Sequence, residues 1–226
     1  MKKFAFPLLL LSHLSFAQTG LWLDAGLSKK WNKSLKSSIE LGYRQNFGKG
    51  FDRIYADFGQ AVKLIDGLKI SAAYRLVLNE KGDQLILTEQ QLSNRFQLGI
   101  DFDILDAFDI GSKRLQLSLN STQQWGLEAQ KRTNSIWRNK ITFGYDIKHF
   151  PITPFVSAEH FYRWNANVTY TATDVIITGE TVQWRYFIGA SFELPKQHSL
   201  KIQFGLRDRA SGVQAIMRAS YQYNFK

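Results

Sequence analysis

The stretch MRASYQYNFK, residues 217–226, decides the fold class because two kinds of side chain alternate along it. One series is apolar and comprises Met217, Ala219, Tyr221, Tyr223 and Phe225. The other series is polar and comprises Arg218, Ser220, Gln222 and Asn224. Alternation with a period of two is typical of a β-strand that has one apolar and one polar face. The stretch therefore predicts a strand, and the question is which of its faces points into the protein.

The same period recurs along most of the chain. Clear examples are GLWLDAGLSKK (20–30), SIELGYRQNF (38–47), RIYADFGQAVKL (53–64), LKISAAYRLVL (68–78) and LSNRFQLGIDFDI (92–104). Further runs cover 114–125, 135–148, 154–164, 182–194, 199–208 and 214–225. These runs make eleven candidate strands. Bacterial single-chain barrels have an even number, so either 20–30 is not a full wall strand or one lies unrecognised in 79–90 or 165–181. We expect ten to twelve.

The N-terminus predicts export. Lys2 and Lys3 precede the apolar run 4–11, and Ser15 and Ala17 place small residues where a signal peptidase reads them. We expect residues 1–17 to be a signal peptide and 18–226 to form one mature domain; a buried N-terminal helix is the alternative. The apolar run is too short for a membrane helix. The chain has no cysteine, which excludes lipoprotein attachment, disulfides and thiol chemistry.

The charge balance indicates an anionic partner. The formal net charge is +10, and removal of Lys2 and Lys3 leaves +8 on the mature chain. An exported chain does not meet nucleic acid, so anionic lipid or an anionic solute is the expected partner class.

Alternation alone leaves the interior face open. A lipocalin-like soluble barrel is apolar inside, whereas a membrane barrel is apolar outside. Strands of about ten to thirteen residues suit a tilted membrane crossing, because soluble strands average about five or six. Short connections are expected at 31–33, 65–67, 149–153 and 195–198, and longer ones at 47–52, 79–90, 126–134 and 165–181. This near-regular alternation fits one rim in the periplasm and one facing outward.

We therefore predict an all-β fold, an antiparallel up-and-down transmembrane β-barrel in the outer membrane of a Gram-negative cell. Aromatic residues near strand ends are candidates for interfacial girdles. They are Tyr43, Tyr74, Trp125, Trp137, Tyr145, Tyr162, Trp184, Tyr186 and Tyr223. We expect a monomer in contact with outer-membrane lipid. A secreted soluble β-barrel that binds a ligand is the alternative.

Five longer stretches resemble a known family. They are LWLDAGLSKKWNKSLKSSIELGYR (21–44), LKISAAYRL (68–76), RNKITFGYDI (138–147), ITPFVSAEHFYR (152–163) and RYFIGASFELPKQHSLKIQF (185–204). In this order they are similar to the Bacteroidota outer-membrane proteins grouped as a domain of unknown function (DUF2490). The resemblance covers nearly the whole mature chain. It implies a barrel in the outer membrane, and it implies no reaction and no catalytic residues.

Candidates for chemistry are few. His160 lies on the apolar face, where a lipid-face hydrolase would carry its base, but Ser157 projects to the opposite face and no serine lies two residues away. We therefore expect an interfacial histidine and no enzyme, with a lipid-face hydrolase as the alternative. The spacing of acids in DILDAFDIGSK (103–113) does not match a calcium loop, and this stretch is interpreted as a solvated turn. No metal site and no cofactor are expected.

The polar face is the feature with functional content. Its predicted basic residues are Lys36, Arg44, Arg53, Lys63, Lys69, Arg75, Arg95, Arg114, Arg138, Lys140, Arg163, Arg185, Lys201, Arg207 and Arg218. Its predicted acids are Asp24, Glu40, Asp57, Asp101, Asp103, Asp146, Glu159 and Glu193. We predict a lumen charge network that includes Glu40, Arg44, Arg75, Arg95, Glu159, Arg163, Arg185 and Glu193. Such a lumen is either plugged by ion pairs or forms a narrow pore that favours anions.

The C-terminal strand generates the first testable prediction. Barrel-assembly machinery recognises an aromatic-alternating last strand that usually ends in Phe, and here Tyr221, Tyr223 and Phe225 match while Lys226 follows. Replacing Phe225 should therefore reduce outer-membrane assembly more than deleting Lys226. Heat-modifiable gel mobility of membrane fractions measures this difference, and equal effects of the two changes would contradict the assembly role.

Overall fold

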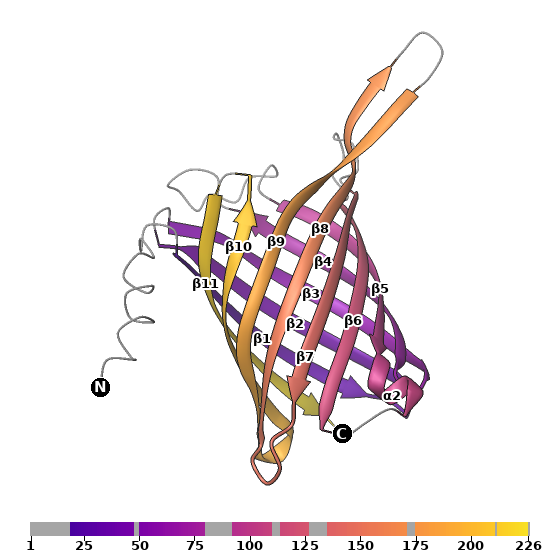
Figure 1. Ribbon diagram of the computed structural model, residues 1–226, viewed down its shortest axis with the longest axis vertical. Helices are drawn as coiled ribbons and strands as arrows, with labels where there is room; N and C mark the ends of the chain where they lie inside the picture. Colours follow the sequence, from indigo (N-terminus) through magenta and orange to yellow (C-terminus); the bar gives the residue numbers. More distant parts are fainter. Residues whose placement is uncertain are drawn as a thin grey trace, which may run out of the picture.

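The computed structural model describes residues 19–47, 50–79, 92–109, 114–126, 135–170, 175–210 and 212–225, with the backbone alone at 165–170 and 175–177. The predicted signal peptide, 1–17, lies outside the described residues. Eleven strands form one closed barrel (Figure 1). The elements are β1 (Thr19–Lys30), β2 (Leu35–Asn46), β3 (Gly50–Ile65), β4 (Leu68–Asn79), β5 (Leu92–Asp103), α2 (Ile104–Phe108), β6 (Leu115–Gly126), β7 (Ser135–Tyr145), β8 (Ile152–Tyr170), β9 (Val175–Leu194), η2 (Pro195–Gln197), β10 (His198–Arg209) and β11 (Gly212–Phe225).

The barrel closes through a parallel seam. Every strand pairs antiparallel with its neighbour in sequence, and β1 then pairs parallel with β11, with Trp22 opposite Arg218 and Leu27 opposite Tyr223. An odd number of up-and-down strands makes the first and last run in the same direction, so they can only meet in parallel. The explanation that 20–30 is not a full wall strand was wrong, because β1 pairs with β2 as well as β11. The eleven strands confirm the expected ten to twelve, and no strand separates β4 from β5 or β8 from β9 in the wall, because each of these pairs is hydrogen-bonded directly.

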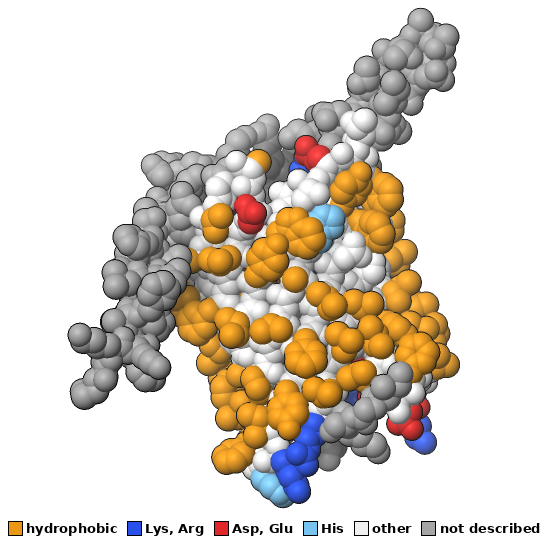
Figure 2. Space-filling model, in the orientation of Figure 1, with side chains coloured by type: hydrophobic (Ala, Val, Ile, Leu, Met, Phe, Trp, Pro, Cys, Tyr) orange, Lys and Arg blue, Asp and Glu red, His pale blue; other side chains and the backbone are white. Residues whose placement is uncertain are grey.

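The wall is apolar outside and polar inside. Along β1 the outward Leu23 is 42% exposed, whereas the inward Asp24 is 6% exposed. The same inversion holds around the barrel, where large apolar side chains cover the outer surface (Figure 2). This distribution confirms a transmembrane-type barrel whose apolar series faces lipid. No helix in the described part of the chain is long and apolar enough to cross a membrane.

The two rims differ. The lower rim of Figure 1 carries the turns 31–34, 66–67 and 146–151 together with α2 and η2. At the upper rim β2, β4, β6 and β10 end, and β3, β5, β7 and β11 begin. The long connections predicted at 79–90 and 126–134 lie almost entirely outside the described residues. Two connections expected to be long are shorter, because β3 begins at Gly50 and because β8 and β9 extend to Tyr170 and from Val175. The β8–β9 hairpin projects beyond the wall, past register shifts at Phe161/Tyr162 and Arg163/Asn167 (Figure 1).

The stretch 103–113 also differs from the solvated turn expected for it. The Asp103 side chain accepts a hydrogen bond from the Asp106 backbone N–H at 3.4 Å and caps the short helix α2. A carboxylate at this position satisfies a backbone donor that the helix leaves unpaired. Asp103 therefore begins a short helix on the lower rim and Asp109 ends it. Residues 110–113 of this stretch lie outside the described residues.

The apolar outer face and polar inner face of the wall predict where a new charged side chain is tolerated. Leu41 lies in the middle of β2 and is 57% exposed, whereas Ser71 on β4 lines a cavity in the lumen. Leu41→Arg should lower the free energy of unfolding in lipid vesicles by about 2–4 kcal/mol, because the guanidinium would enter hydrocarbon. Ser71→Arg is the matched control and should cost less, since its side chain extends into the lumen. Equal losses in denaturant titrations would contradict the assignment of faces.

Candidate functional site in the charged lumen

A cavity of about 850 Å³ opens inside the upper half of the barrel. Nine arginines line it, and we call it the arginine vestibule. They are Arg44, Arg53, Arg75, Arg95, Arg138, Arg163, Arg185, Arg209 and Arg218. The carboxylates in its lining are Glu40 and Asp57. The lining is therefore strongly basic.

The structure brings most of the predicted network together. Glu40, Arg44, Arg75, Arg95, Arg163 and Arg185 line the arginine vestibule, and Glu159 lies beside it on β8. Glu193 does not join them, because it is exposed at the end of β9 near the lower rim. The arginines gather because strands of similar tilt place their upper inward positions around one space.

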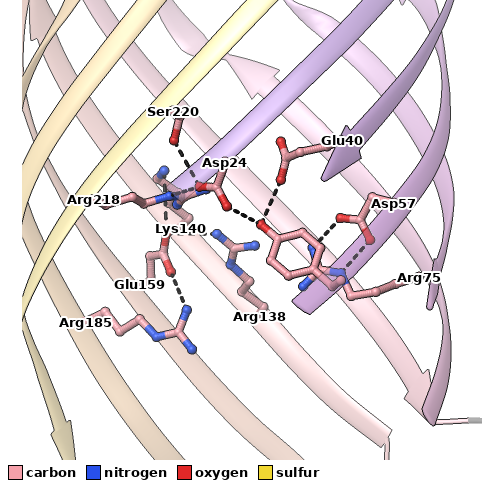
Figure 3. Close-up of polar contacts among 11 residues, drawn as sticks. Asp24, Glu40, Asp57, Arg75, Arg138, Lys140, Glu159, Arg185, Arg218 and Ser220 are labelled. Atoms are coloured by element: carbon pink, nitrogen blue, oxygen red, sulfur yellow. Dashed lines mark hydrogen bonds and ion pairs between the residues drawn. The ribbon is translucent and has the colours of Figure 1, made fainter. Parts of the chain in front are cut away.

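Glu159 is the most enclosed charge in the lumen. It is 1% exposed and has three cations around it: Arg138 at 2.8 Å, Lys140 at 3.5 Å and Arg185 at 3.6 Å (Figure 3). Register creates this cluster, since Lys140 on β7 and Arg185 on β9 are the direct partners of Glu159 on β8. One carboxylate thus compensates several buried cations.

A second network crosses the closing seam. Asp24 on β1 accepts from Arg218 Nε at 2.6 Å and from Ser220 Oγ at 3.0 Å, both on β11. The Tyr55 hydroxyl on β3 contacts Asp24 at 2.5 Å and Glu40 at 2.9 Å (Figure 3). Tyr55 fits there because position 42 is glycine, where a Cβ would overlap the phenol ring.

The bidentate pair of Arg75 and Asp57 lies beside this network and joins β3 to β4. In each of these networks the ion pairs connect neighbouring strands. They therefore tie adjacent strands of the wall together on its lumen side.

Like charges also face each other directly across neighbouring strands. Arginine faces arginine in three inward pairs: Arg44 with Arg53, Arg75 with Arg95, and Arg185 with Arg207. Two acids, Glu40 and Asp57, face each other in the same way. Like charges directly opposite one another destabilise a sheet. Two of these arginines also have a carboxylate partner on a neighbouring strand, since Arg75 pairs with Asp57 and Arg185 with Glu159.

Inward aromatic side chains were missed from the sequence. Trp22 is 2% exposed, and the Arg44 guanidinium carbon lies 4.3 Å from the centre of its ring. Tyr55 stacks on Arg75 at 4.2 Å, and Phe161 stacks on Arg185 at 4.2 Å. Alternation with a period of two already places Trp22 on the same face as Asp24, and Tyr55 on the same face as Asp57. The sequence therefore contained the signal, but these aromatic residues were not assigned to the lumen because a purely polar lumen was expected.

His160 faces outward, as its parity predicted. Its ring centre lies 4.4 Å from that of Trp184, and Nε2 is 3.2 Å from Thr181 Oγ1. Tyr162 lies next to it, at 6.4 Å between ring centres. This is the environment of an interfacial aromatic cluster, and the described residues place no serine in hydrogen bond with His160. Among the same residues no group of three His, Cys, Asp or Glu could hold a metal ion.

The predicted assembly residues lie at the lower end of β11. His198 Nδ1 lies 2.5 Å from the Tyr221 hydroxyl, and its ring packs on Tyr223 at 4.7 Å. Tyr223 meets Phe225 edge to face at 4.6 Å. The three aromatic residues and His198 therefore form one outward cluster near the lower rim.

Comparison with solved structures finds a likeness to the NanC porin. The TM-score is 0.51 at 12% sequence identity, and the match covers 87% of this chain and 87% of that chain. No family model matches this chain, and no curated protein matches it. The likeness shows a shared porin-like barrel fold. Membership of the DUF2490 family stays a prediction.

Glu159 generates a prediction about stability. Glu159→Gln keeps the shape of the side chain but leaves Arg138, Lys140 and Arg185 without their shared carboxylate. The free energy of unfolding should fall by about 3–5 kcal/mol, the typical cost of removing one partner from a buried ion pair. Glu180→Gln is the control, because its pair with Arg163 is exposed and should contribute less than about 1 kcal/mol. Similar losses for both variants in denaturant titrations would show that Glu159 does not organise the lumen.

Proposed function

We propose that the chain is an outer-membrane barrel whose narrow lumen admits small anions through the arginine vestibule. The observation that carries this proposal is the excess of arginine in the vestibule, whose lining holds nine arginines and two carboxylates, Glu40 and Asp57. Arginine also faces arginine in three inward pairs, and an anion between two guanidinium groups would offset their repulsion. The likeness to a porin supports the same class of function through the fold.

The arginines make the electrostatic potential inside the lumen positive. Fixed charges surrounded by low-dielectric walls focus the field and raise the local concentration of counter-ions. Guanidinium groups also recognise carboxylate and phosphate with paired hydrogen bonds. Rings of Arg and Lys are a known way for pores to select anions. The arginine vestibule therefore favours anions over cations.

Basic side chains also line the lower end of the lumen, although Lys69 has Asp101 as a neighbour on β5. Lys30 faces Lys36 across β1 and β2, and Lys63 faces Lys69 across β3 and β4. Lys63 also pairs with Asp66 in the turn on this rim. An anion would therefore meet basic side chains at both ends of the barrel.

The middle of the lumen limits the size of a solute. Trp22 and Phe187 approach to 6.2 Å between ring centres, and Tyr55 reaches Asp24 from two strands away. A barrel of eleven strands is only modestly wider than the eight-stranded barrels that side chains fill. The passage is therefore narrow, and only small anions or a rearranged interior would allow conduction.

The outer surface of the barrel supports a proposal about its location and its partners. The apolar outer face supports contact with outer-membrane lipid and argues against a soluble ligand-binding barrel. The aromatic end of β11 supports recognition by the barrel-assembly machinery. We further propose that the barrel acts as a monomer, and the resemblance to DUF2490 proteins is consistent with this setting.

Planar-bilayer recording tests the proposal. Purified barrel under a KCl gradient should give small conductance steps and a reversal potential that indicates preference for chloride. The double variant R53Q/R95Q should shift the reversal potential toward zero, whereas Lys196→Gln in the lower-rim η2 should not. An absence of conductance would instead support a lumen plugged by ion pairs. A preference for potassium would contradict the proposal that the lumen selects anions.

A further inference from the structure

We infer that Arg44, Arg185 and Arg207, gathered around Trp22, form a specific oxyanion site at the edge of the arginine vestibule, whose lining includes Arg44 and Arg185. The ligand class is a small solute that carries a phosphate, sulfate or carboxylate group. This inference rests on the proposed function, because it names what the same vestibule binds. It differs from general selectivity in requiring one defined site.

Arg44 has unusual surroundings for a buried arginine. It is 9% exposed, and among the described residues it has no hydrogen bond or ion pair. Its guanidinium carbon lies 4.3 Å from the centre of the Trp22 ring and 5.2 Å from that of Tyr55. Across the strand it faces another arginine, Arg53. The two rings thus hold a fork of N–H donors that have no acceptor in the described protein.

Trp22 is the centre of the cluster. The Arg185 and Arg207 guanidinium carbons lie 5.0 and 5.6 Å from its ring centre, so three arginines surround one indole. Phe187 and Ile216 pack with Trp22 in a buried apolar cluster and fix its position. Cation–π contacts with a fixed aromatic ring orient guanidinium groups without satisfying their hydrogen bonds.

The local charge is not balanced by the protein. The carboxylate paired with Arg185 is Glu159 at 3.6 Å, which Arg138 and Lys140 also share. Arg207 donates to the neutral amide oxygen of Gln214. In the described part of the chain, the buried Nε atoms of Arg44, Arg185 and Arg207 have no hydrogen-bond acceptor. Buried donors and charges of this kind are costly unless a partner binds them.

The chemistry of the ligand follows from these donors. Guanidinium forks match the paired oxygens of carboxylate and phosphate, whereas chloride offers no matching pair. A cavity of about 850 Å³ falls within the range that holds small organic molecules. The site therefore suits a solute with one or two oxyanion groups better than a halide ion.

Isothermal titration of the full-length barrel in a non-ionic detergent tests this site with inorganic phosphate, sulfate, acetate and chloride as probes. At constant ionic strength, phosphate or another oxyanion should bind saturably and chloride should not compete. Arg44→Gln should weaken oxyanion binding about tenfold or more, the typical loss for a charged hydrogen bond. Lys148→Gln removes the same charge from an exposed lower-rim turn and should leave affinity within about twofold, since surface charges are screened.

A second variant separates the contribution of the planar guanidinium donors from that of the positive charge. Arg44→Lys keeps the charge but loses the planar donors, so its affinity should also fall clearly below that of the unchanged chain. Heat-modifiable mobility first establishes that each variant is folded; if Arg44→Gln does not fold, Arg44→Lys carries the test. Full affinity in Arg44→Lys, equal weakening by Lys148→Gln, or chloride competing as well as phosphate would overturn the site. A barrel that binds phosphate without conducting would refute the proposed passage and leave this site standing, and an anion-selective barrel without oxyanion binding would do the reverse.

Discussion

The rest of the structure depends on the closure of the sheet. Inside a lipid bilayer every backbone N–H and C=O must be paired within the protein, so a β-sheet can span it only without edges. Here an odd number of strands makes the closing pair parallel, between β1 and β11. Side chains reinforce that seam from the lumen, where Asp24 meets Arg218 and Ser28 donates to Asn224. The polar interior therefore contributes to closure as well as to function.

Closure also forces the inward side chains into a narrow space. Glu159 shares one carboxylate among three cations, and Tyr55 reaches Asp24 only because Gly42 leaves room. Acids are too few near the arginine vestibule to neutralise its arginines. The same interior that holds the wall together thus retains an excess of positive charge. That excess is the physical basis of the proposed passage of anions.

Much of the wall could be predicted from alternation alone. Period two placed Leu23 outside and Asp24 inside, and the aromatic end of β11 outside, because successive side chains of a strand point to opposite faces. The eleven candidate strands were confirmed, whereas the preference for an even number came from what is usual for such barrels and nothing in the residues required it. The prediction of a long connection at 165–181 was wrong, because the polar composition of this segment was interpreted as a loop. In the structure β8 continues to Tyr170 and β9 begins at Val175, and the two strands extend beyond the wall. Trp22 was overlooked although its parity was available.

By itself the sequence determined which side chains share a face, which ends of strands are aromatic, and that the inward face carries more arginines than acids. Only the tertiary structure decided which of those side chains meet. Register between strands sets Arg44 against Arg53 and places Glu159 between Lys140 and Arg185. Closure brings β9 and β10 near β1, so that Arg185 and Arg207 approach Trp22. The physical reason is that alternation is a property of one strand, whereas register and closure depend on hydrogen bonding among all eleven.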